Sequence, residues 1–218
     1  MILFGTDGIR GRYGDFPLDD STIKKIGCSI AKSFGNTVKK VIIGHDGRES
    51  CGAILDSLID GINFINSYDI INLELFPTPS LPLILSKNDS EDAIGIEITA
   101  SHNPYLDNGI KIFNKNGYKI SSALERKIEE IVATQNDVNK TSSAKFINSS
   151  PMKSVYIDFI SGLLSSIKKC PTNLNIAVDC ANGATSRVIN DITFPDNISL
   201  NIFNNTPNGV NINDNCGA

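Results

Sequence analysis

ITASHNP at residues 98–104, with DNGIKIF at residues 107–113, is the most informative stretch of this 218-residue chain. The overlapping segment 94–99, IGIEIT, is short, rich in β-branched residues and bounded by turn residues, which predicts a buried strand. Pro104 then ends the extended segment, because proline lacks a backbone donor and restricts the residue before it. We therefore expect Ser101 in an exposed polar turn after a strand, where backbone amides can face an anion.

Two other polar loops share the character of this turn. Asp-Asn-Gly at residues 107–109 forms one, and FGTDGIRG at residues 4–11 forms the other. The glycines of FGTDGIRG let the backbone approach a ligand closely, and Arg10 adds a permanent cation beside them. Each loop alone is a weak signal. An isolated Ser-His-Asn-Pro is most simply a strand-ending turn in which Ser101 caps the next element.

Together the three loops resemble the α-D-phosphohexomutases, a family of phosphoglucomutases, phosphomannomutases and phosphoglucosamine mutases. VDCANGAT at residues 178–185 and PNGVNINDNCGA at residues 207–218 resemble the corresponding segments of bacterial phosphoglucosamine mutases. The resemblance covers essentially the whole chain. One departure is HDGR at residues 45–48, where the family often has Arg-Asp-Thr-Arg. This departure changes the first and third residues, to His45 and Gly47, and keeps the acidic residue and the last arginine.

The resemblance implies intramolecular phosphoryl transfer from glucosamine 6-phosphate to glucosamine 1-phosphate, through a phosphoserine and a bisphosphorylated sugar. It implies a hexosamine phosphate and its 1,6-bisphosphate as partners, and it is compatible with a homodimer. The family's metal loop, of the type DGDxDR, and its later sugar and phosphate loops would follow Ala218. We therefore expect an N-terminal part of such an enzyme, inactive by itself.

The same resemblance assigns roles to four residues. Ser101 is the candidate phosphoserine, and its phosphate would be the only ligand from this chain to a Mg²⁺ cofactor. Lys111 and Arg10 match basic positions beside the phosphoserine, and Lys111 could also exchange protons with a sugar hydroxyl. His102 is expected to shape the loop or to contact the phosphate, and a purely structural role is equally open.

Simpler roles for these side chains stay open at this point. Lys111 could be a solvent-facing charge at a strand edge, and Arg10 could form a loop salt bridge with Asp7 or Asp46. Asp46 and Arg48 are expected to brace a loop rather than to take part in catalysis.

Other functions also remain open. A non-catalytic phosphosugar-binding or assembly module would keep the fold and the loops, and a phosphomannomutase or phosphoglucomutase would share the motifs. A Ser-His-Asp hydrolase is more remote, because His102 adjoins Ser101 and no nucleophile elbow accompanies His45.

Composition is that of an ordinary globular domain, with 40% hydrophobic and 20% charged residues. The net charge of −4 and the scattered basic residues argue against nucleic acid as a partner. A membrane partner is not expected, because the sequence lacks both a stretch of about 18 apolar residues and a signal peptide. Five cysteines without a CxxC pair suggest neither disulfides nor zinc. We expect a cytoplasmic protein.

Apolar residues at helical spacing predict helices, and short β-branched runs predict strands. The expected helices cover residues 20–34, 54–65, 122–132, 153–168 and 184–191; the expected strands cover residues 38–44, 71–76, 94–99, 174–179 and 198–203. Asp19 to Ser21 are candidate caps of the first helix, and Ser122 with Glu125 forms a candidate capping box.

Strands that alternate with helices predict an α/β fold. We expect a layered α/β/α domain with a mixed, mainly parallel sheet over residues 1–140. A polar segment without apolar periodicity suggests a linker at residues 141–152. Residues 153–218 would begin a second, similar domain that is incomplete.

Overall fold

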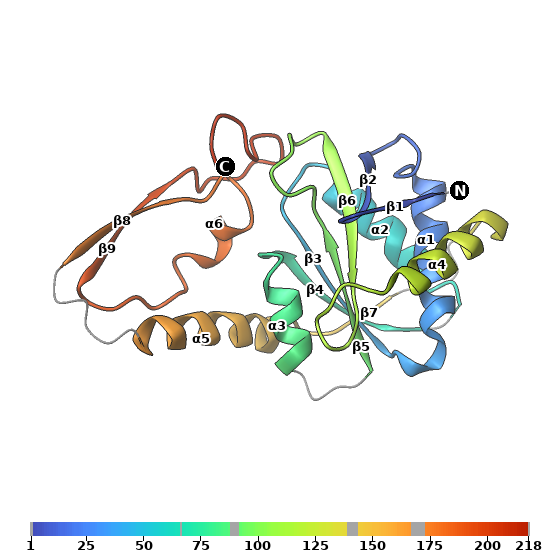
Figure 1. The fold of residues 1–218 in the computed structure, drawn as a ribbon, viewed down its shortest axis with the longest axis horizontal. Coiled ribbons are helices and arrows are strands. Elements are labelled where there is room, and N and C mark those ends of the chain that lie inside the picture. Colours follow the sequence, from blue (N-terminus) through green and yellow to red (C-terminus); the bar gives the residue numbers. More distant parts are fainter. Residues whose placement is uncertain (1, 66, 88–91, 139–143, 167–172, 218) are drawn as a thin grey trace.

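A seven-stranded mixed sheet lies at the centre of the first part of the chain (Figure 1). The computed structural model describes residues 2–65, 67–87, 92–138, 144–166 and 173–217. The strands are β1 (Phe4–Gly5), β2 (Gly8–Arg12), β3 (Lys40–His45), β4 (Asp69–Leu75), β5 (Ala93–Ile98), β6 (Asp107–Phe113) and β7 (Lys145–Phe146). Their spatial order is β1-β2-β6-β5-β3-β4-β7. β5, β3, β4 and β7 run parallel, whereas β6 is antiparallel to both β5 and β2.

Helices cover both faces of this sheet. The helices α1 (Asp20–Phe34), α2 (Cys51–Ile62) and α4 (Ser122–Thr134) pack on one face, and α3 (Ser80–Lys87) packs on the other. Strand side chains alternate between the two cores, so that Ile43 joins the first cluster and Ile42 the second. This arrangement confirms the predicted α/β layered fold.

Two helix starts were predicted, and one prediction was wrong by one residue. The Asp19 carboxylate caps α1 by accepting from the Thr22 amide at 3.0 Å, as expected. Helix α4 is instead capped by Ser121, whose hydroxyl accepts from the Leu124 amide at 3.3 Å. Glu125 then lies too far along for a capping box, and its carboxylate pairs with Lys119 at 2.9 Å.

Long-range pairing turned two expected loops into strands. FGTDGIRG forms the hairpin of β1 and β2, and DNGIKIF forms β6 from its first residue onward. Ile9 of β2 lies opposite Ile110 of β6, 101 positions later in the chain. Local turn propensity gives no sign of such a partner, which is why both segments were missed. Helix α3 was also missed; its sequence contains Pro82, and proline is unfavourable inside a helix.

A second unit follows, which we define as residues 150–166 and 173–217. It contains α5 (Ser150–Ser166), β8 (Leu174–Asp179), α6 (Thr185–Val188) and β9 (Ile198–Phe203), with β8 and β9 paired in parallel. Both strands and α5 were predicted, whereas α6 is shorter than expected and ends before Asn190, a residue that favours turns. β7, inside the expected linker, adds to the first sheet beside β4.

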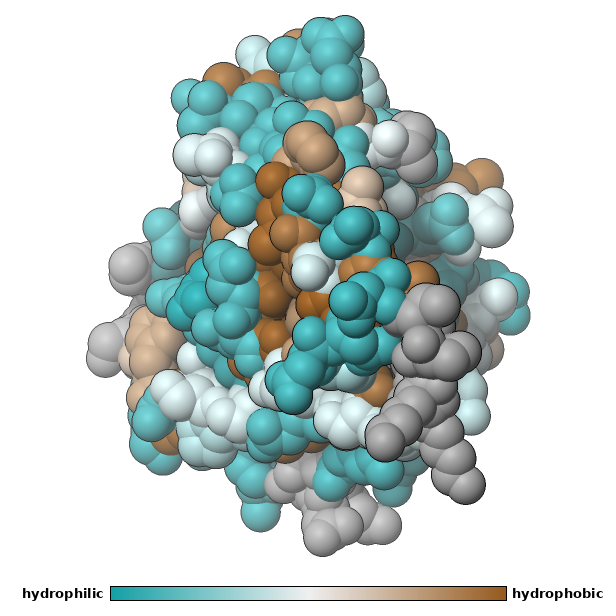
Figure 2. Space-filling model, turned by 90° about the vertical axis from the view of Figure 1, so that its left-hand side faces the viewer, coloured by the Kyte–Doolittle hydropathy of each residue, from teal (hydrophilic) through white to brown (hydrophobic). Residues whose placement is uncertain are grey.

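The second unit leaves much of its apolar surface uncovered. No side chain of α5 is fully buried, and Phe159, Leu163, Leu174 and Phe203 are all exposed. Figure 2 looks onto this side of the molecule and shows a hollowed hydrophobic strip with hydrophilic borders. Among the described residues, no helix has the length and apolar character needed to cross a membrane.

Candidate active site

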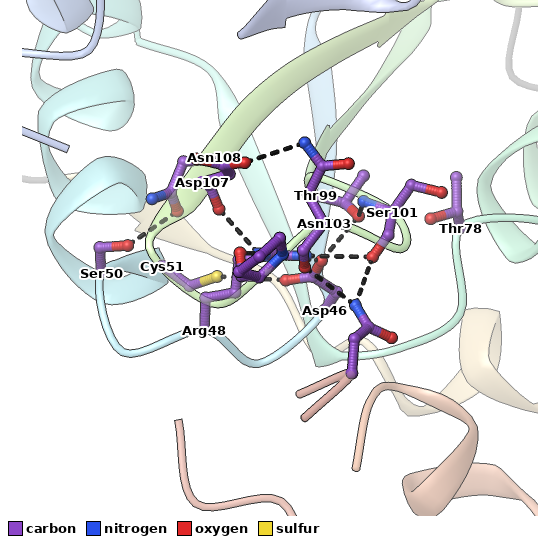
Figure 3. Close-up of polar contacts among 12 residues, drawn as sticks. Asp46, Arg48, Ser50, Cys51, Thr78, Thr99, Ser101, Asn103, Asp107 and Asn108 are labelled. Atoms are coloured by element: carbon purple, nitrogen blue, oxygen red, sulfur yellow. Dashed lines mark hydrogen bonds and ion pairs between the residues drawn. The ribbon is translucent and has the colours of Figure 1, made fainter. Parts of the chain in front are cut away.

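The serine loop, residues 99–107, follows β5 and returns the chain to β6. Ser101 lies exposed in this loop with a left-handed φ of +58°, a conformation that is costly for a residue with a Cβ atom. The Ser101 amide donates to the Thr99 hydroxyl at 2.9 Å, and that hydroxyl donates to Asp46 at 2.7 Å (Figure 3). The position of Ser101 is therefore tied to the end of β3.

Arg48 fixes the backbone of the serine loop from inside the protein. Its side chain is fully buried, and its Nε donates to the Asp46 carboxylate at 2.9 Å. The remaining guanidinium N–H groups donate to four loop carbonyls, those of Ser101, Asn103, Pro104 and Asp107 (Figure 3). A planar, always charged fork suits such a set of acceptors. The expectation that Asp46 and Arg48 brace a loop agrees with these contacts.

Two predicted cations lie on the same face of the sheet. Arg10 of β2 pairs with Gly109 of β6, and Lys111 is two residues further along β6. Because side chains alternate along a strand, both cations point away from the core that holds Ile110. A Cβ atom at Gly109 would lie 2.8 Å from Cδ of Arg10, so the glycine makes room for the arginine.

The contacts of Arg10 and Lys111 differ from those expected for a loop salt bridge and for a solvent-facing charge at a strand edge. The Arg10 guanidinium donates to the Thr99 carbonyl at 3.2 Å, two residues before Ser101. No ion pair joins it to Asp7 or Asp46 in the described part of the chain. Lys111 lines a cleft of about 310 Å³ together with Thr78, Lys119, Asp7, Phe113 and two prolines. The Lys111 side chain therefore faces a cleft on the same side of the sheet as Arg10.

Glu97 is a buried acid that was not predicted as part of the site. It lies on β5 directly opposite Lys111 on β6, and its side chain is completely buried. One carboxyl oxygen accepts from the Thr78 hydroxyl at 3.3 Å, and the other has no partner among the described residues. Burial raises the pKa of the Glu97 carboxyl well above its usual range; the charge of Asp46 adds to this effect, and Lys111 opposes it.

His102 and His45 lie apart from the Lys111 cleft. His102 is exposed and lines a second cleft of about 330 Å³, where the serine loop meets Val210, Ile212 and Asn213 of the second unit. Burial lowers the pKa of the His45 imidazole, and its Nδ1 has no partner among the described residues. Asp46 bonds to Arg48 and Thr99 instead, so the contacts do not form a hydrolase triad.

Two residues that contact or adjoin the site were missed from sequence. A carboxyl group in the middle of the apolar strand IGIEIT was a visible signal for Glu97, because a fully buried strand rarely holds one. Asn213 donates its side-chain amide to carbonyls of the serine loop, and nothing local to PNGVNIND indicates such a contact.

The first part of the chain matches the family model "Phosphoglucomutase/phosphomannomutase, alpha/beta/alpha domain I" over residues 1–139. The match covers more than half of the chain, and the chain therefore belongs to the phosphoglucomutase/phosphomannomutase family.

Phosphoglucosamine mutases are among its curated relatives. The protein of that name from Aliarcobacter butzleri is 39% identical over 227 aligned residues, which cover 100% of this chain and 50% of the relative. The one from Acetivibrio thermocellus is 36% identical over 220 residues, which cover 99% and 48%. The chain thus spans about half the length of the curated relatives it matches.

Solved structures share the fold. A putative phosphomannomutase from Thermus thermophilus superposes with a TM-score of 0.76 at 19% identity, covering 96% of this chain and 47% of that one. Aspergillus fumigatus N-acetylphosphoglucosamine mutase, solved in complex with GlcNAc-6P and magnesium, gives a TM-score of 0.55 at 14% identity, with coverages of 100% and 43%. Identities this low establish the fold alone.

Proposed function

We propose that this chain is the phosphoserine-bearing part of a phosphoglucosamine mutase, which interconverts glucosamine 6-phosphate and glucosamine 1-phosphate. The choice of sugar rests on relatives of that name at 39% and 36% identity. The reaction rests mainly on one observation: Ser101 is exposed on a loop whose backbone is held by buried Arg48.

The proposed transfer has two steps that balance. First, the bond between Ser101 Oγ and phosphorus breaks while a sugar hydroxyl oxygen bonds to phosphorus. The proton of that hydroxyl ends on Ser101 Oγ, and a bisphosphorylated sugar results. Second, the other phosphoryl group passes from the sugar to Ser101 Oγ, and the proton returns to the sugar oxygen.

The two cations near the loop supply what these steps require. A serine phosphate bears about −1.5 to −2 charges, which must be compensated during the transfer. Arg10 donates to the carbonyl of Thr99, at the start of the serine loop, and Lys111 lines a cleft on the same face of the sheet as Arg10. We assign Lys111 the movement of the proton between the sugar hydroxyl and Ser101, because an amine can both accept and donate one.

Mg²⁺ is the proposed cofactor, since a structural relative was solved with magnesium. The ion would stabilise charge on the transferring phosphoryl group. The described residues contain no cluster of three or more His, Cys, Asp or Glu side chains that could hold a metal. They therefore do not fit Mg²⁺ by themselves, beyond a phosphate on Ser101, and the steps above involve only this chain's own groups.

Peptide mapping by mass spectrometry tests the assignment directly. A phosphate, about 80 Da, is expected on the peptide that contains Ser101, and its occupancy should rise after incubation with glucosamine 1,6-bisphosphate. Ser101→Ala should remove the modified peptide. Normal turnover by a complete mutase with this substitution would refute the proposal. Binding of glucosamine 6-phosphate without any phosphate on Ser101 would favour the non-catalytic module.

Lys111→Ala tests the proposed role of Lys111 in proton transfer. The substitution should slow phosphoryl transfer much more than it lowers the free energy of unfolding, because the side chain faces a cleft and not the core. Equal losses in both measurements would assign the lysine to the fold.

Other features remain proposals of the same kind. A cytoplasmic location suits the free thiols of Cys28, Cys51, Cys180 and Cys216, since disulfides are rare in reducing compartments. The homodimer and the domain limits at residues 1–140, 141–152 and 153–218 stay predictions.

A further inference from the structure

The side chain of Asn213, in the second unit, hydrogen-bonds to the backbone of the serine loop. Its side-chain amide nitrogen, Nδ2, donates to the carbonyl oxygens of Ser101 at 2.8 Å and Asn103 at 3.0 Å. The same two carbonyls accept from Nη2 of Arg48, at 3.0 and 3.1 Å. Because a carbonyl oxygen has two lone pairs, each of these acceptors is fully used, once by each part of the chain.

Asn213 is itself held in place. Its backbone amide donates to the Ala181 carbonyl at 3.0 Å, and its neighbour Ile212 is buried. The segment 209–213 makes another contact with the first part of the chain, where the Glu49 backbone amide donates to the Gly209 carbonyl at 2.9 Å. Residues 209–213 thus touch the chain both at the serine loop and directly beside Arg48.

These contacts fix the direction of a further group. The C=O and N–H of one trans peptide point in opposite directions, so the Ser101 carbonyl determines where the His102 N–H points. That N–H has no partner among the hydrogen bonds of the described residues. It therefore points away from Arg48 and Asn213, and an unpaired amide of this kind can donate to an anion.

We propose that Asn213 is a positioning residue for Ser101. It joins the second unit to the serine loop and helps to hold the left-handed backbone that presents the hydroxyl and the His102 N–H. Its consequence for phosphoryl transfer rests on the proposed function, whereas the link between the two parts of the chain does not.

Glycine is the informative substitution, because Asn213 has a φ of +58° that glycine adopts without strain. Asn213→Gly removes the two donated hydrogen bonds and leaves the backbone free to keep its conformation. Asn215→Gly is the matched control. Asn215 also has a left-handed φ, of +52°, and is exposed, and its side-chain amide donates to Asp214 rather than to the serine loop.

Hydrogen exchange measured by mass spectrometry reports on the link. Peptides that contain residues 101–107 should exchange roughly tenfold faster in Asn213→Gly, as expected for the loss of two hydrogen bonds. They should be unchanged in Asn215→Gly. Unchanged exchange in Asn213→Gly would overturn the proposal.

Asn213→Gly could also loosen the second unit as a whole, and faster exchange in β8 would reveal this. A second variant is then needed. Asn213→Asp keeps the size of the side chain but places an acceptor against two carbonyls, so the serine loop should again exchange faster. Protection of the loop equal to that of the unmodified chain would overturn the proposal in this case too.

Measuring Ser101 phosphorylation and turnover together with loop exchange distinguishes failure of this proposal from failure of the proposed function. In a form of the protein that turns over, Asn213→Gly should lower kcat and leave KM for the sugar phosphate nearly unchanged, because the Asn213 side chain hydrogen-bonds to the backbone of the serine loop. Faster loop exchange in a protein that never phosphorylates Ser101 would refute the function and retain the link. Slower transfer without a change in loop exchange would refute the link.

Discussion

Replacing Arg48 by methionine tests whether this side chain organises the serine loop. The substitution keeps much of the buried volume but removes the charge and all the N–H donors. Four loop carbonyls then lose a partner, and the Asp46 carboxylate loses its ion pair. Asp46 keeps the Thr99 hydroxyl, and the Ser101 and Asn103 carbonyls keep Asn213.

The size of the effect follows from these contacts. Removing one partner of a buried ion pair costs about 3–5 kcal/mol, because the remaining charge stays buried without compensation. The remaining partners moderate the cost, and we expect a loss of about 4 kcal/mol. Domains of this kind are stable by about 5–15 kcal/mol, so Arg48→Met should consume a large part of the total.

Urea unfolding followed by circular dichroism measures this loss. Arg12→Met is the matched control, because Arg12 is 65% exposed and lies 3.9 Å from Asp107. It should cost less than about 0.5 kcal/mol. The double variant with Asp46→Asn should be less destabilised than the sum of the single variants. A loss below about 1 kcal/mol for Arg48→Met would show that Arg48 does not organise the serine loop.

Three further predictions concern single side chains. The folded protein holds the Glu97 proton more tightly than the unfolded chain does. The contribution of this protonated carboxyl group to the free energy of unfolding is therefore fully present below its ordinary pKa of 4.5, and it is lost as the pH rises through the raised pKa of the folded state. Glu97→Gln should therefore gain stability relative to the unmodified chain as pH rises above 4.5, and parallel unfolding curves would contradict this. Burial, and then the charge of Asp46, raise the pKa of the Cys51 thiol to about 12, so N-ethylmaleimide near neutral pH should modify the half-buried Cys216 before Cys51; mass spectrometry would show the order, and earlier modification of Cys51 would contradict this. Ser121→Ala should lower the free energy of unfolding in urea by about 1 kcal/mol, because it removes the side chain that caps helix α4. An equal loss for Ser122→Ala would contradict this and would favour the capping box of Ser122 and Glu125.

Local sequence patterns predicted those parts of the molecule that depend on neighbouring residues. The buried strands and the amphipathic helices follow from side-chain spacing, and the cap at Asp19 follows from residue type. The hairpin of β1 and β2 and the strand β6 depend on pairing across the chain, as between Ile9 and Ile110. Such pairing has no local signature.

The same distinction applies to the candidate site. Ser101 and the nearby Arg10 and Lys111 could be named from motifs, although their roles remain proposals. Arg48 was expected to brace a loop, but its four carbonyl partners depend on how the loop folds over it. Asn213 is 110 residues from Asn103, and only the folded chain brings the two together.

The uncovered apolar surface of the second unit has a practical consequence for handling the protein. Exposed apolar groups such as Phe159, Leu163 and Phe203 favour association with other apolar surfaces. Sulfate and phosphate salts strengthen such burial, because they are excluded from protein surfaces. We therefore expect the solubility limit of the purified chain to fall steeply with added ammonium sulfate, and dilute buffers without such salts should suit its storage and spectroscopy best.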